Sequence, residues 1–448
     1  MTEQLNPNIS ISDLYDIYLQ CGEITTDSRN CPKGSLFFAI KGERFDGNQF
    51  AEKAIENGCA FAVIDNKDYQ KDHRFILVDN VLLTLQALAR EHRRHFQIPV
   101  IGITGTNGKT TTKELIAAVL SERYNVLFTQ GNLNNDIGVP QTLFRLNKNH
   151  DIAVIEMGAS HPEDIKRLAE TAEPNFGIIT NVGKAHLQGF GSFEGVIKTK
   201  KELFDFLRTR EDSIAFLNAS NPYLVDMAQG LAVVPYSSTE NLPLTTCGSI
   251  IDCAPFVRFQ WHEPVENIDK MGENCKIHEV KTHLIGSYNI DNLMAAITIG
   301  LFFSVTPTEI CHALENYIPT NNRSQLENTV HNHLIIDAYN ANPTSMKAAL
   351  ENFKLMAVSP KMAILGDMKE LGNASLEEHQ KIIELLKQLD LTDVWLVGDE
   401  FSRTTNPFRT FRDVEAVKDA LNEQLPEGKY ILVKGSNSMR LAQLKELL

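Results

Sequence analysis

Residues 100–120 read VIGITGTNGKTTTKELIAAVL and carry the strongest structural signal in the chain. The stretch begins with an apolar run that predicts a buried strand, continues through two glycines that predict a turn, and opens a helical pattern at Lys109. Backbone N–H groups at a helix N-terminus attract anions, and the Lys109 ammonium can reach the outer phosphates of a nucleotide. The Thr110 hydroxyl can ligate magnesium. We therefore expect a phosphate-binding loop between a strand and a helix.

The loop departs from the strict nucleotide-binding pattern at one position. That pattern requires a glycine five residues before Gly108, where this chain has Ile103. A glycine turn before an ordinary helix is the alternative interpretation, although it leaves the combination of strand, lysine, threonine and helix unexplained.

The pattern on both sides of the loop predicts three domains. Residues 1–94 hold short apolar runs separated by turns and predict a small α/β domain. Residues 95–317 alternate apolar strands with helical segments, which is typical of a parallel sheet, and residues 238–285 within them predict a β insertion. Residues 318–448 repeat the alternation in LIIDAY, MAILGD, VWLVGDE and YILVKG, so we expect a separate Rossmann-like domain.

The composition excludes several classes of protein. Of 448 residues, 43% are hydrophobic and 22% charged, and no apolar run reaches the ~20 residues needed to span a bilayer. The first residues lack a basic segment leading into an apolar one, so we expect no secretory signal and a cytoplasmic protein. The net charge of −14 disfavours nonspecific nucleic-acid binding. Seven scattered cysteines without a CxxC pair indicate neither a disulfide framework nor a zinc site.

Several motifs resemble, in the same order, those of the Mur ligase family. TGTNGKTT resembles the family's variant of the phosphate loop, which accounts for Ile103. YNANP, LGDMKELG and LVKGS resemble the branch that adds D-alanyl-D-alanine more than the branches that add single amino acids. The matching segments, which cover nearly the whole chain, also include GNLNNDIGVP (131–140), IEMGASHPEDI (155–165), TNVGKAHLQGFGS (180–192), GSYNIDN (286–292), DAYNANPTSM (337–346) and LGDMKELG (365–372).

The resemblance implies that the central domain binds ATP. The loop residues expected to hold ATP are Gly105, Thr106, Asn107, Gly108, Lys109, Thr110 and Thr111. Asn289 and Asn292 would present amides to the adenine edges, and Tyr288 stands where many relatives have histidine. Helix capping by Asn289 explains that residue equally well without the resemblance.

Metal ligands are expected at the carboxyl edge of the central sheet. Glu156 ends one predicted strand and His186 follows the next, so both would project beside the phosphate loop. The resemblance makes them ligands of a second Mg²⁺, while Thr110 ligates the first, and it gives His186 and Lys109 catalytic roles. An isolated glutamate or histidine at a strand end is more often a solvated or capping residue.

Lys200 resembles the family lysine that becomes carbamylated. The modification turns a cation into a carboxylate-like anion able to bind magnesium, so we expect Lys200 to be both catalytic and a metal ligand. Lys198 and Lys201 lie beside it, and a basic helix face is the alternative.

In the C-terminal domain the resemblance selects five residues. Arg323 and Asp337 would contact ATP, although Asn322 replaces the usual glycine before the arginine. The residues expected to bind the incoming dipeptide are Asn340, Asn342 and Lys434. A plain turn before Pro343 would also use asparagines.

In the N-terminal domain the resemblance implies a site for a UDP-linked sugar. Its residues would be Ser28, Arg29, Lys41, Phe45, Asp46 and Gly47. In the central domain, Asn134 and Asn135 are also expected to bind substrate. Without the resemblance, these are ordinary surface residues.

The reaction implied by the resemblance is amide synthesis. ATP would phosphorylate the carboxyl group of UDP-N-acetylmuramoyl tripeptide, and the amine of D-alanyl-D-alanine would attack the acyl phosphate, releasing ADP and phosphate. We expect a monomer. The alternatives are another amide ligase, such as a folylpolyglutamate synthase or a ligase adding one amino acid, and a P-loop regulatory protein that hydrolyses ATP while binding a partner.

Overall fold

The computed structural model describes residues 9–42, 45–185, 187–239, 242–265, 276–320 and 325–448. The chain folds into two compact units, and β7 (Val100–Thr104) passes from one to the other. The first unit comprises Met1–Gly102, Asn125–Gly158 and Asp164–Asn175, and the second comprises Ile103–Tyr124, Ala159–Glu163 and Phe176–Leu448. Among the described residues, no helix is both long and apolar enough to cross a membrane.

A four-stranded parallel sheet forms the N-terminal part of the first unit. Its strands, in spatial order, are β1 (Ile24–Thr25), β2 (Leu36–Phe38), β5 (Phe61–Ile64) and β6 (Phe75–Leu77). The run LFFA explains the layers, because successive side chains of a strand point to opposite faces. Leu36 and Phe38 pack with α1 (Ile11–Cys21) and α3 (Val81–Arg94), whereas Phe37 and Ala39 pack with α2 (Ala51–Glu56).

The rest of the first unit supplies part of a second α/β layer. β8 (Val126–Phe128) and β9 (Ile152–Glu156) pair in parallel, and α5 (Gly138–Leu143) and α6 (Asp164–Ala172) contact α3. β9 is buried at all five positions, as expected for a strand covered on both faces.

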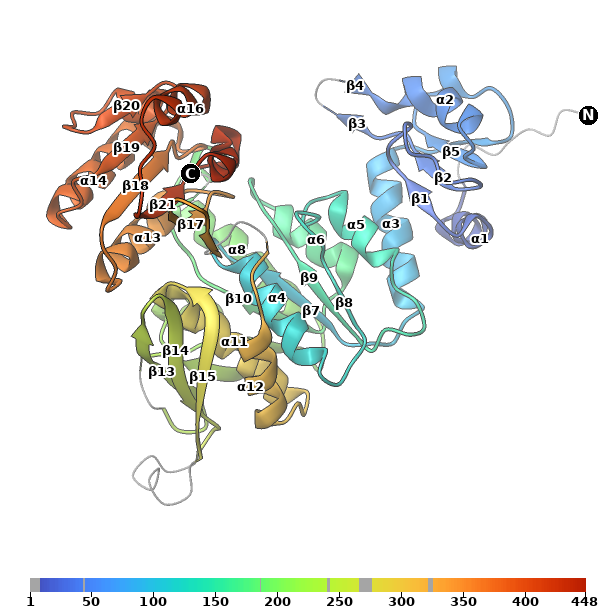
Figure 1. The fold of residues 1–448 in the computed structure, drawn as a ribbon. Helices are drawn as coiled ribbons and strands as arrows, with labels where there is room; N and C mark the ends of the chain where they lie inside the picture. Colours follow the sequence, from blue (N-terminus) through green and yellow to red (C-terminus); the bar gives the residue numbers. More distant parts are fainter. Residues whose placement is uncertain (1–8, 43–44, 186, 240–241, 266–275, 321–324) are drawn as a thin grey trace, which may run out of the picture. The chain divides into compact units, whose positions relative to one another are not determined.

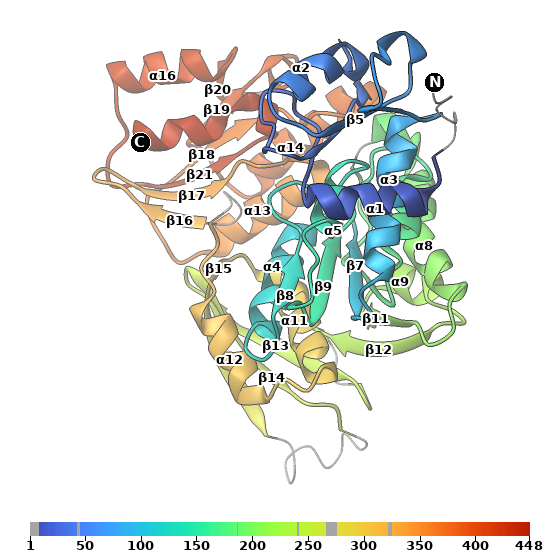
Figure 2. The same ribbon diagram turned by 90° about the vertical axis from the view of Figure 1, so that its right-hand side faces the viewer.

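The second unit begins with the phosphate loop and its helix α4 (Lys109–Leu120). The strands β10 (Phe176–Ile179), β11 (Ile214–Asn218), β12 (Ala232–Ser237) and β13 (Thr246–Cys253) follow one another in parallel. β14 (Phe256–His262) and β15 (Ile277–Ile285) follow β13 in an antiparallel meander, and these three strands lie within the β insertion predicted over residues 238–285. The helices of this part are α7 (Leu187–Phe190), α8 (Phe193–Arg208), α9 (Pro222–Met227), α11 (Ile290–Phe302) and α12 (Pro307–Asn316). α11 lies against α4, and α12 covers β15 (Figures 1 and 2).

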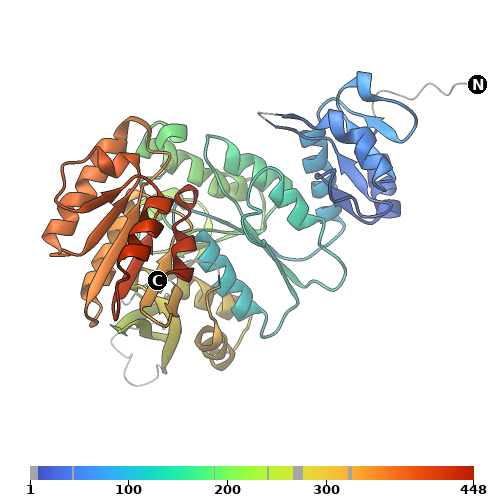
Figure 3. The ribbon, with the colours of Figure 1, turned by 45° about the horizontal axis from the view of Figure 1, so that its top comes forward.

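A six-stranded sheet follows toward the C-terminus. Its order is β16 (Gln325–Asn328), β17 (His333–Asp337), β21 (Tyr430–Lys434), β18 (Lys361–Gly366), β19 (Val394–Val397) and β20 (Arg409–Phe411), and only β16 is antiparallel. One face packs α13 (Pro343–Leu355) and α14 (Ser375–Gln388), and the other packs α16 (Val414–Glu423), as Figure 3 shows. The predicted α/β fold, with a parallel central sheet, a β insertion and a Rossmann-like C-terminal domain, is confirmed.

Two buried histidines are kept neutral chiefly by their burial, and their hydrogen bonds fix the tautomer. His379 Nε2 accepts from the Met368 N–H at 3.0 Å, and its Nδ1 donates to Ser375 O at 2.7 Å. In the first unit, His92 Nε2 lies 3.1 Å from Leu146 O, so that nitrogen carries the proton. Burial lowers the pKa of both imidazoles below the ordinary value of 6.5. Protonating either ring in the folded protein is therefore unfavourable.

We predict that the protein loses stability as the pH falls from about 6.5 toward these lowered pKa values, because the unfolded chain then binds more protons than the folded chain. His379→Gln should make the urea midpoint less sensitive to a change from about pH 7.5 to about pH 5.5. The exposed His73 is the matched control, and His73→Gln should keep the wild-type pH dependence. Identical pH profiles for wild type and His379→Gln would contradict the assignment.

Candidate active site

The phosphate loop has the predicted strand, turn and helix. Gly105 and Gly108 have φ angles of 143° and 78°, which side chains other than glycine rarely adopt. A Cβ on Gly105 would also lie 2.0 Å from Thr180 Oγ1. Lys109 is the first residue of α4, and its Nζ donates to Gly105 O at 2.8 Å and to Thr106 O at 3.1 Å. The ammonium therefore lies over the loop, next to the helix N-terminus.

The segment after β10 holds this loop in shape. Thr180 N–H donates to Thr104 O at 2.9 Å, which pairs the end of β7 with the end of β10. Asn107 N–H donates to Asn181 Oδ1 at 2.9 Å, and Asn107 O accepts from Thr180 Oγ1 at 2.6 Å and from Asn181 Nδ2 at 3.0 Å. Sequence reasoning missed Thr180 and Asn181, although both lie in the quoted motif TNVGKAH.

Asn289 and Asn292 are buried behind the loop. Asn289 Nδ2 donates to Ile285 O at 2.8 Å, and Asn292 Nδ2 donates to Asn289 Oδ1 at 2.8 Å. Thr112 Oγ1 in turn donates to Asn292 Oδ1 at 3.0 Å, so the two amides tie α11 to α4. Asn289 makes no side-chain cap. Their role toward adenine stays a prediction.

Lys200 differs from the lysines beside it. It lies on α8, is 2% exposed, and its Nζ lies 5.5 Å from the centre of the Phe190 ring. Lys198 is exposed, and Lys201 pairs with Asp205 at 2.7 Å. The structure thus places Lys200 in the interior and Lys198 and Lys201 at the surface. From the sequence, only the resemblance had distinguished Lys200 from the other two.

The predicted metal ligands are distributed as follows. In the second unit the Thr110 hydroxyl belongs to a residue 4% exposed in the first turn of α4. In the first unit Glu156 is 1% exposed, and its Oε1 accepts from Asn134 Nδ2 at 2.8 Å. His186 lies outside the described residues. Across the described residues, no three His, Cys, Asp or Glu side chains cluster as a metal cage. Thr110 and Glu156 each carry side-chain oxygen, the ligand type that Mg²⁺ prefers, and their roles as metal ligands stay predictions.

In the C-terminal domain, Asp337 and Lys434 form an ion pair, although Asp337 was expected to contact ATP and Lys434 to contact the dipeptide. Lys434 Nζ lies 2.5 Å from Asp337 Oδ2, and the two residues face each other in the β17–β21 register. The Lys434 side chain is 1% exposed, and its Nζ also lies 3.4 Å from Asn340 O. Asn340 Oδ1 accepts from the Ala341 N–H at 2.8 Å. Arg323 lies outside the described residues.

A second polar cluster follows β18 and was not predicted. The buried Asp367 carboxylate accepts from the Glu400 and Phe401 N–H groups at 3.2 and 3.1 Å and pairs with Lys369 at 3.0 Å. Lys369 N–H donates to Ser436 Oγ at 2.9 Å. These residues belong to LGDMKELG and LVKGS, which had served as family signatures without individual roles.

The residues expected to bind the UDP sugar lie on a small hairpin and its flanks. β3 (Lys41–Gly42) pairs with β4 (Phe45–Asp46), and a Cβ on Gly47 would lie 2.3 Å from Ile40 O. Lys41 pairs with Asp65 at 2.8 Å, a partner that the sequence did not reveal. Elsewhere in this unit, Arg29 pairs with Asp27 at 2.8 Å, Ser28 O accepts from Asn57 Nδ2, and Asn135 Oδ1 accepts from the Gly138 N–H.

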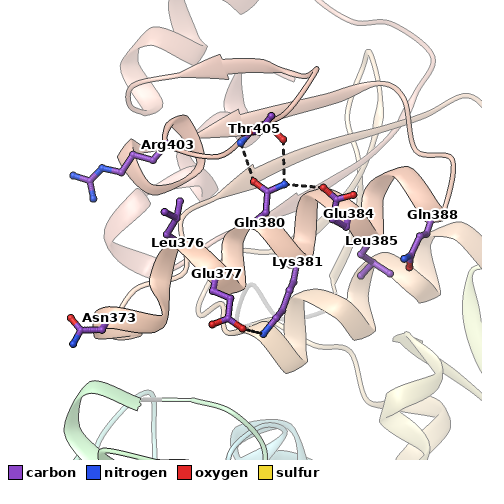
Figure 4. Close-up of a pocket in the computed structure, with 10 residues that line it drawn as sticks. All are labelled: Asn373, Leu376, Glu377, Gln380, Lys381, Glu384, Leu385, Gln388, Arg403 and Thr405. Carbon is purple, nitrogen blue, oxygen red and sulfur yellow. Dashed lines mark hydrogen bonds and ion pairs between the residues drawn. The ribbon is translucent and has the colours of Figure 1, made fainter.

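A hollow of about 720 Å³ lies along α14 (Figure 4). Its polar groups largely bond to one another: Gln380 exchanges hydrogen bonds with Thr405, and Lys381 pairs with Glu377 at 2.5 Å. None of its lining residues belongs to the predicted site, so we assign it no ligand.

Nearly the whole chain is similar to known proteins. Family models match residues 21–102 ("Mur ligase family, catalytic domain"), 103–300 ("Mur ligase middle domain") and 322–437 ("Mur ligase, glutamate ligase domain"). The UDP-N-acetylmuramoyl-tripeptide–D-alanyl-D-alanine ligase of Escherichia coli (strain K12) is 33% identical over 98% of this chain and 97% of its own.

Solved structures agree with this assignment. MurF from Acinetobacter baumannii aligns with a TM-score of 0.84 at 28% identity, covering 98% of this chain and 99% of its own. MurF ligase from Thermotoga maritima in complex with ADP gives 0.83 at 26% identity, covering 96% and 97%. Folylpolyglutamate synthase from Mycobacterium tuberculosis, at 14% identity over 82% of this chain and 94% of its own, shares only the fold, with a TM-score of 0.60. Given the order of its motifs, its phosphate loop and its near full-length similarity to these ligases, the chain belongs to the Mur ligase family.

Proposed function

We propose that the protein is an ATP-dependent ligase that joins D-alanyl-D-alanine to UDP-N-acetylmuramoyl tripeptide in peptidoglycan precursor synthesis. The observation that carries this proposal is the 33% identity to a ligase of that name over 98% of the chain, together with the intact phosphate loop. The weaker likeness to a folylpolyglutamate synthase, which is confined to the fold, favours the cell-wall reaction over that alternative.

In this proposal each domain holds one reactant. Residues 1–94 bind the UDP sugar, residues 95–317 bind ATP, and residues 318–448 bind the incoming dipeptide, with the protein acting as a monomer in the cytoplasm. Lys41 and its neighbours are the candidates for the nucleotide-sugar site, and Lys434 is the candidate for the dipeptide carboxylate, which would compete with Asp337 for the ammonium.

The chemistry follows from the weakness of a carboxylate as an electrophile. Transfer of the γ-phosphate to the tripeptide carboxyl group makes an acyl phosphate, and attack by the dipeptide amine expels phosphate. Lys109 neutralises charge that develops on the phosphate oxygens. Magnesium, held by Thr110, Glu156 and a carbamate on Lys200, would supply further charge neutralisation. Excluding water protects the acyl phosphate from hydrolysis.

The direct test is a reaction with defined components. The protein would be incubated with ATP, magnesium, D-alanyl-D-alanine and UDP-N-acetylmuramoyl tripeptide carrying either diaminopimelate or lysine at the third position, and the products would be identified by mass. We expect a pentapeptide product and equimolar ADP and phosphate. Phosphate release that does not depend on the dipeptide would instead favour a P-loop regulatory protein.

Lys109→Ala should lower the rate of ligation by at least about 100-fold, because a positioned cation acts on charge that develops in the transition state. The side chain is partly exposed and lies outside the core, so the thermal midpoint should stay unchanged. The exposed Lys148 is the matched control, and Lys148→Ala should retain full activity. Wild-type turnover in Lys109→Ala would refute the assignment of the phosphate loop.

Lys200→Ala should lower activity by at least about tenfold, and a short carboxylic acid should restore part of it by supplying the missing anion. Exposed Lys198 and the surface-paired Lys201 are matched controls on the same helix, and their alanine variants should lose little and gain nothing from added acid. Thermal unfolding would check that Lys200→Ala folds. Normal turnover in that variant, or rescue at a control position, would rule out the carbamate at Lys200.

A further inference from the structure

The amino end of α13 sits on the phosphate loop. Asn342 is the N-cap of this helix: its Oδ1 accepts from the Ser345 N–H at 2.9 Å, and Ser345 Oγ accepts from the Asn342 N–H at 3.1 Å. This capping box occupies the carbonyl half of the Asn342 amide. The other half, Nδ2, donates to Asn107 Oδ1 in the phosphate loop at 2.7 Å.

The hydrogen bond between Asn342 and Asn107 is part of a larger contact. Thr344, in the first turn of α13, packs so closely on the loop after β10 that a Cβ on Gly183 would lie 3.0 Å from its hydroxyl. Gly183 in turn exchanges two hydrogen bonds with Thr106, at 3.0 and 3.3 Å. The first turn of α13 therefore contacts both the phosphate loop and the segment that shapes it.

Asn342 is well placed to fix the geometry of that contact. It is 3% exposed, and both amide atoms are engaged, one in its own helix and one across to Asn107. This arrangement differs from the role in dipeptide binding expected from the sequence. An amide whose oxygen and nitrogen each bond to a protein group is held in one orientation and orients those groups in turn.

We propose that Asn342 is a positioning residue that couples the C-terminal domain to the phosphate loop through Asn107. The inference rests on the proposed ATP-dependent ligation. The backbone of Asn107 is held by Asn181 and its side chain by Asn342, so loss of Asn342 removes the hydrogen bond that holds the Asn107 side chain. A loop that samples other shapes spends less time in the form that binds phosphate, and the apparent affinity for nucleotide falls by that fraction.

The test uses the full chain and the neutral variant Asn342→Ser, because serine caps helices well but cannot reach Asn107. We expect ADP binding measured by calorimetry, and kcat/KM for ATP, to fall by about threefold to tenfold, the effect of one hydrogen bond. The KM for D-alanyl-D-alanine should stay within about twofold of wild type. Asn107→Ala should weaken ADP binding similarly, and the double variant should bind no worse than either single variant, because both remove the same bond.

Asn221→Ser is the matched control. Asn221 caps α9 immediately before a proline, as Asn342 does for α13, and its variant should bind ADP as wild type does. Three results would overturn the proposal: wild-type ADP binding by Asn342→Ser, additive losses in the double variant, or a change confined to the KM for D-alanyl-D-alanine. Calorimetry with ADP does not depend on ligation. If the protein bound ADP but formed no product, the proposed function would be wrong, and the ADP affinities of the variants would still test this hydrogen bond.

Discussion

The shape of the phosphate loop depends strongly on the backbone hydrogen bonds of Asn107. Its N–H and its carbonyl are both bonded to the segment after β10, at residues Thr180 and Asn181. These contacts follow from the parallel sheet, since neighbouring parallel strands deliver their carboxyl ends to the same edge. Gly105 lies so close to Thr180 that no side chain fits at this position. The helix α4, the lysine that opens it and the amides that tie α4 to α11 all take their positions from this edge.

The helices and strands could be predicted from sequence because each has a local pattern of apolar and turn residues. The run LFFA places alternate side chains on opposite faces, and LIIDAY and YILVKG are bounded by turn residues. The pairing of side chains across elements could not be predicted in the same way. Lys434 and Asp337 lie almost a hundred residues apart and meet because β17 and β21 are neighbours, a fact of strand order that no local pattern contains. For the same reason the sequence did not predict the bonds made by Asp65, Asn181 and Asp367, whose partners lie on other strands and loops.

Lys434, Lys109 and Lys200 differ in how deeply they are buried and in what surrounds the ammonium group. Lys434 is enclosed with a carboxylate at 2.5 Å, so its charge is matched inside the sheet edge. Lys109 is partly exposed, and its ammonium bonds to two backbone carbonyls of the phosphate loop. Lys200 is enclosed beside an aromatic ring on a helix whose other lysines face solvent or an aspartate. A modification that changes the sign of charge has a large effect at a buried position and little effect in water, because the surrounding medium screens it less. Burial thus distinguishes Lys200 from Lys198 and Lys201, and the carbamate itself stays a prediction.

The contact between Asn342 and Asn107 joins two neutral amides, and this choice of chemistry has consequences for a reaction cycle. An ion pair to the phosphate loop would compete with the charges of ATP and ADP, and its strength would change each time a nucleotide bound or left. A neutral hydrogen bond contributes about 1 kcal/mol and is far less sensitive to salt or to the charge of the ligand. Its strength should therefore change little when a nucleotide binds or leaves, which suits the positioning role proposed for Asn342.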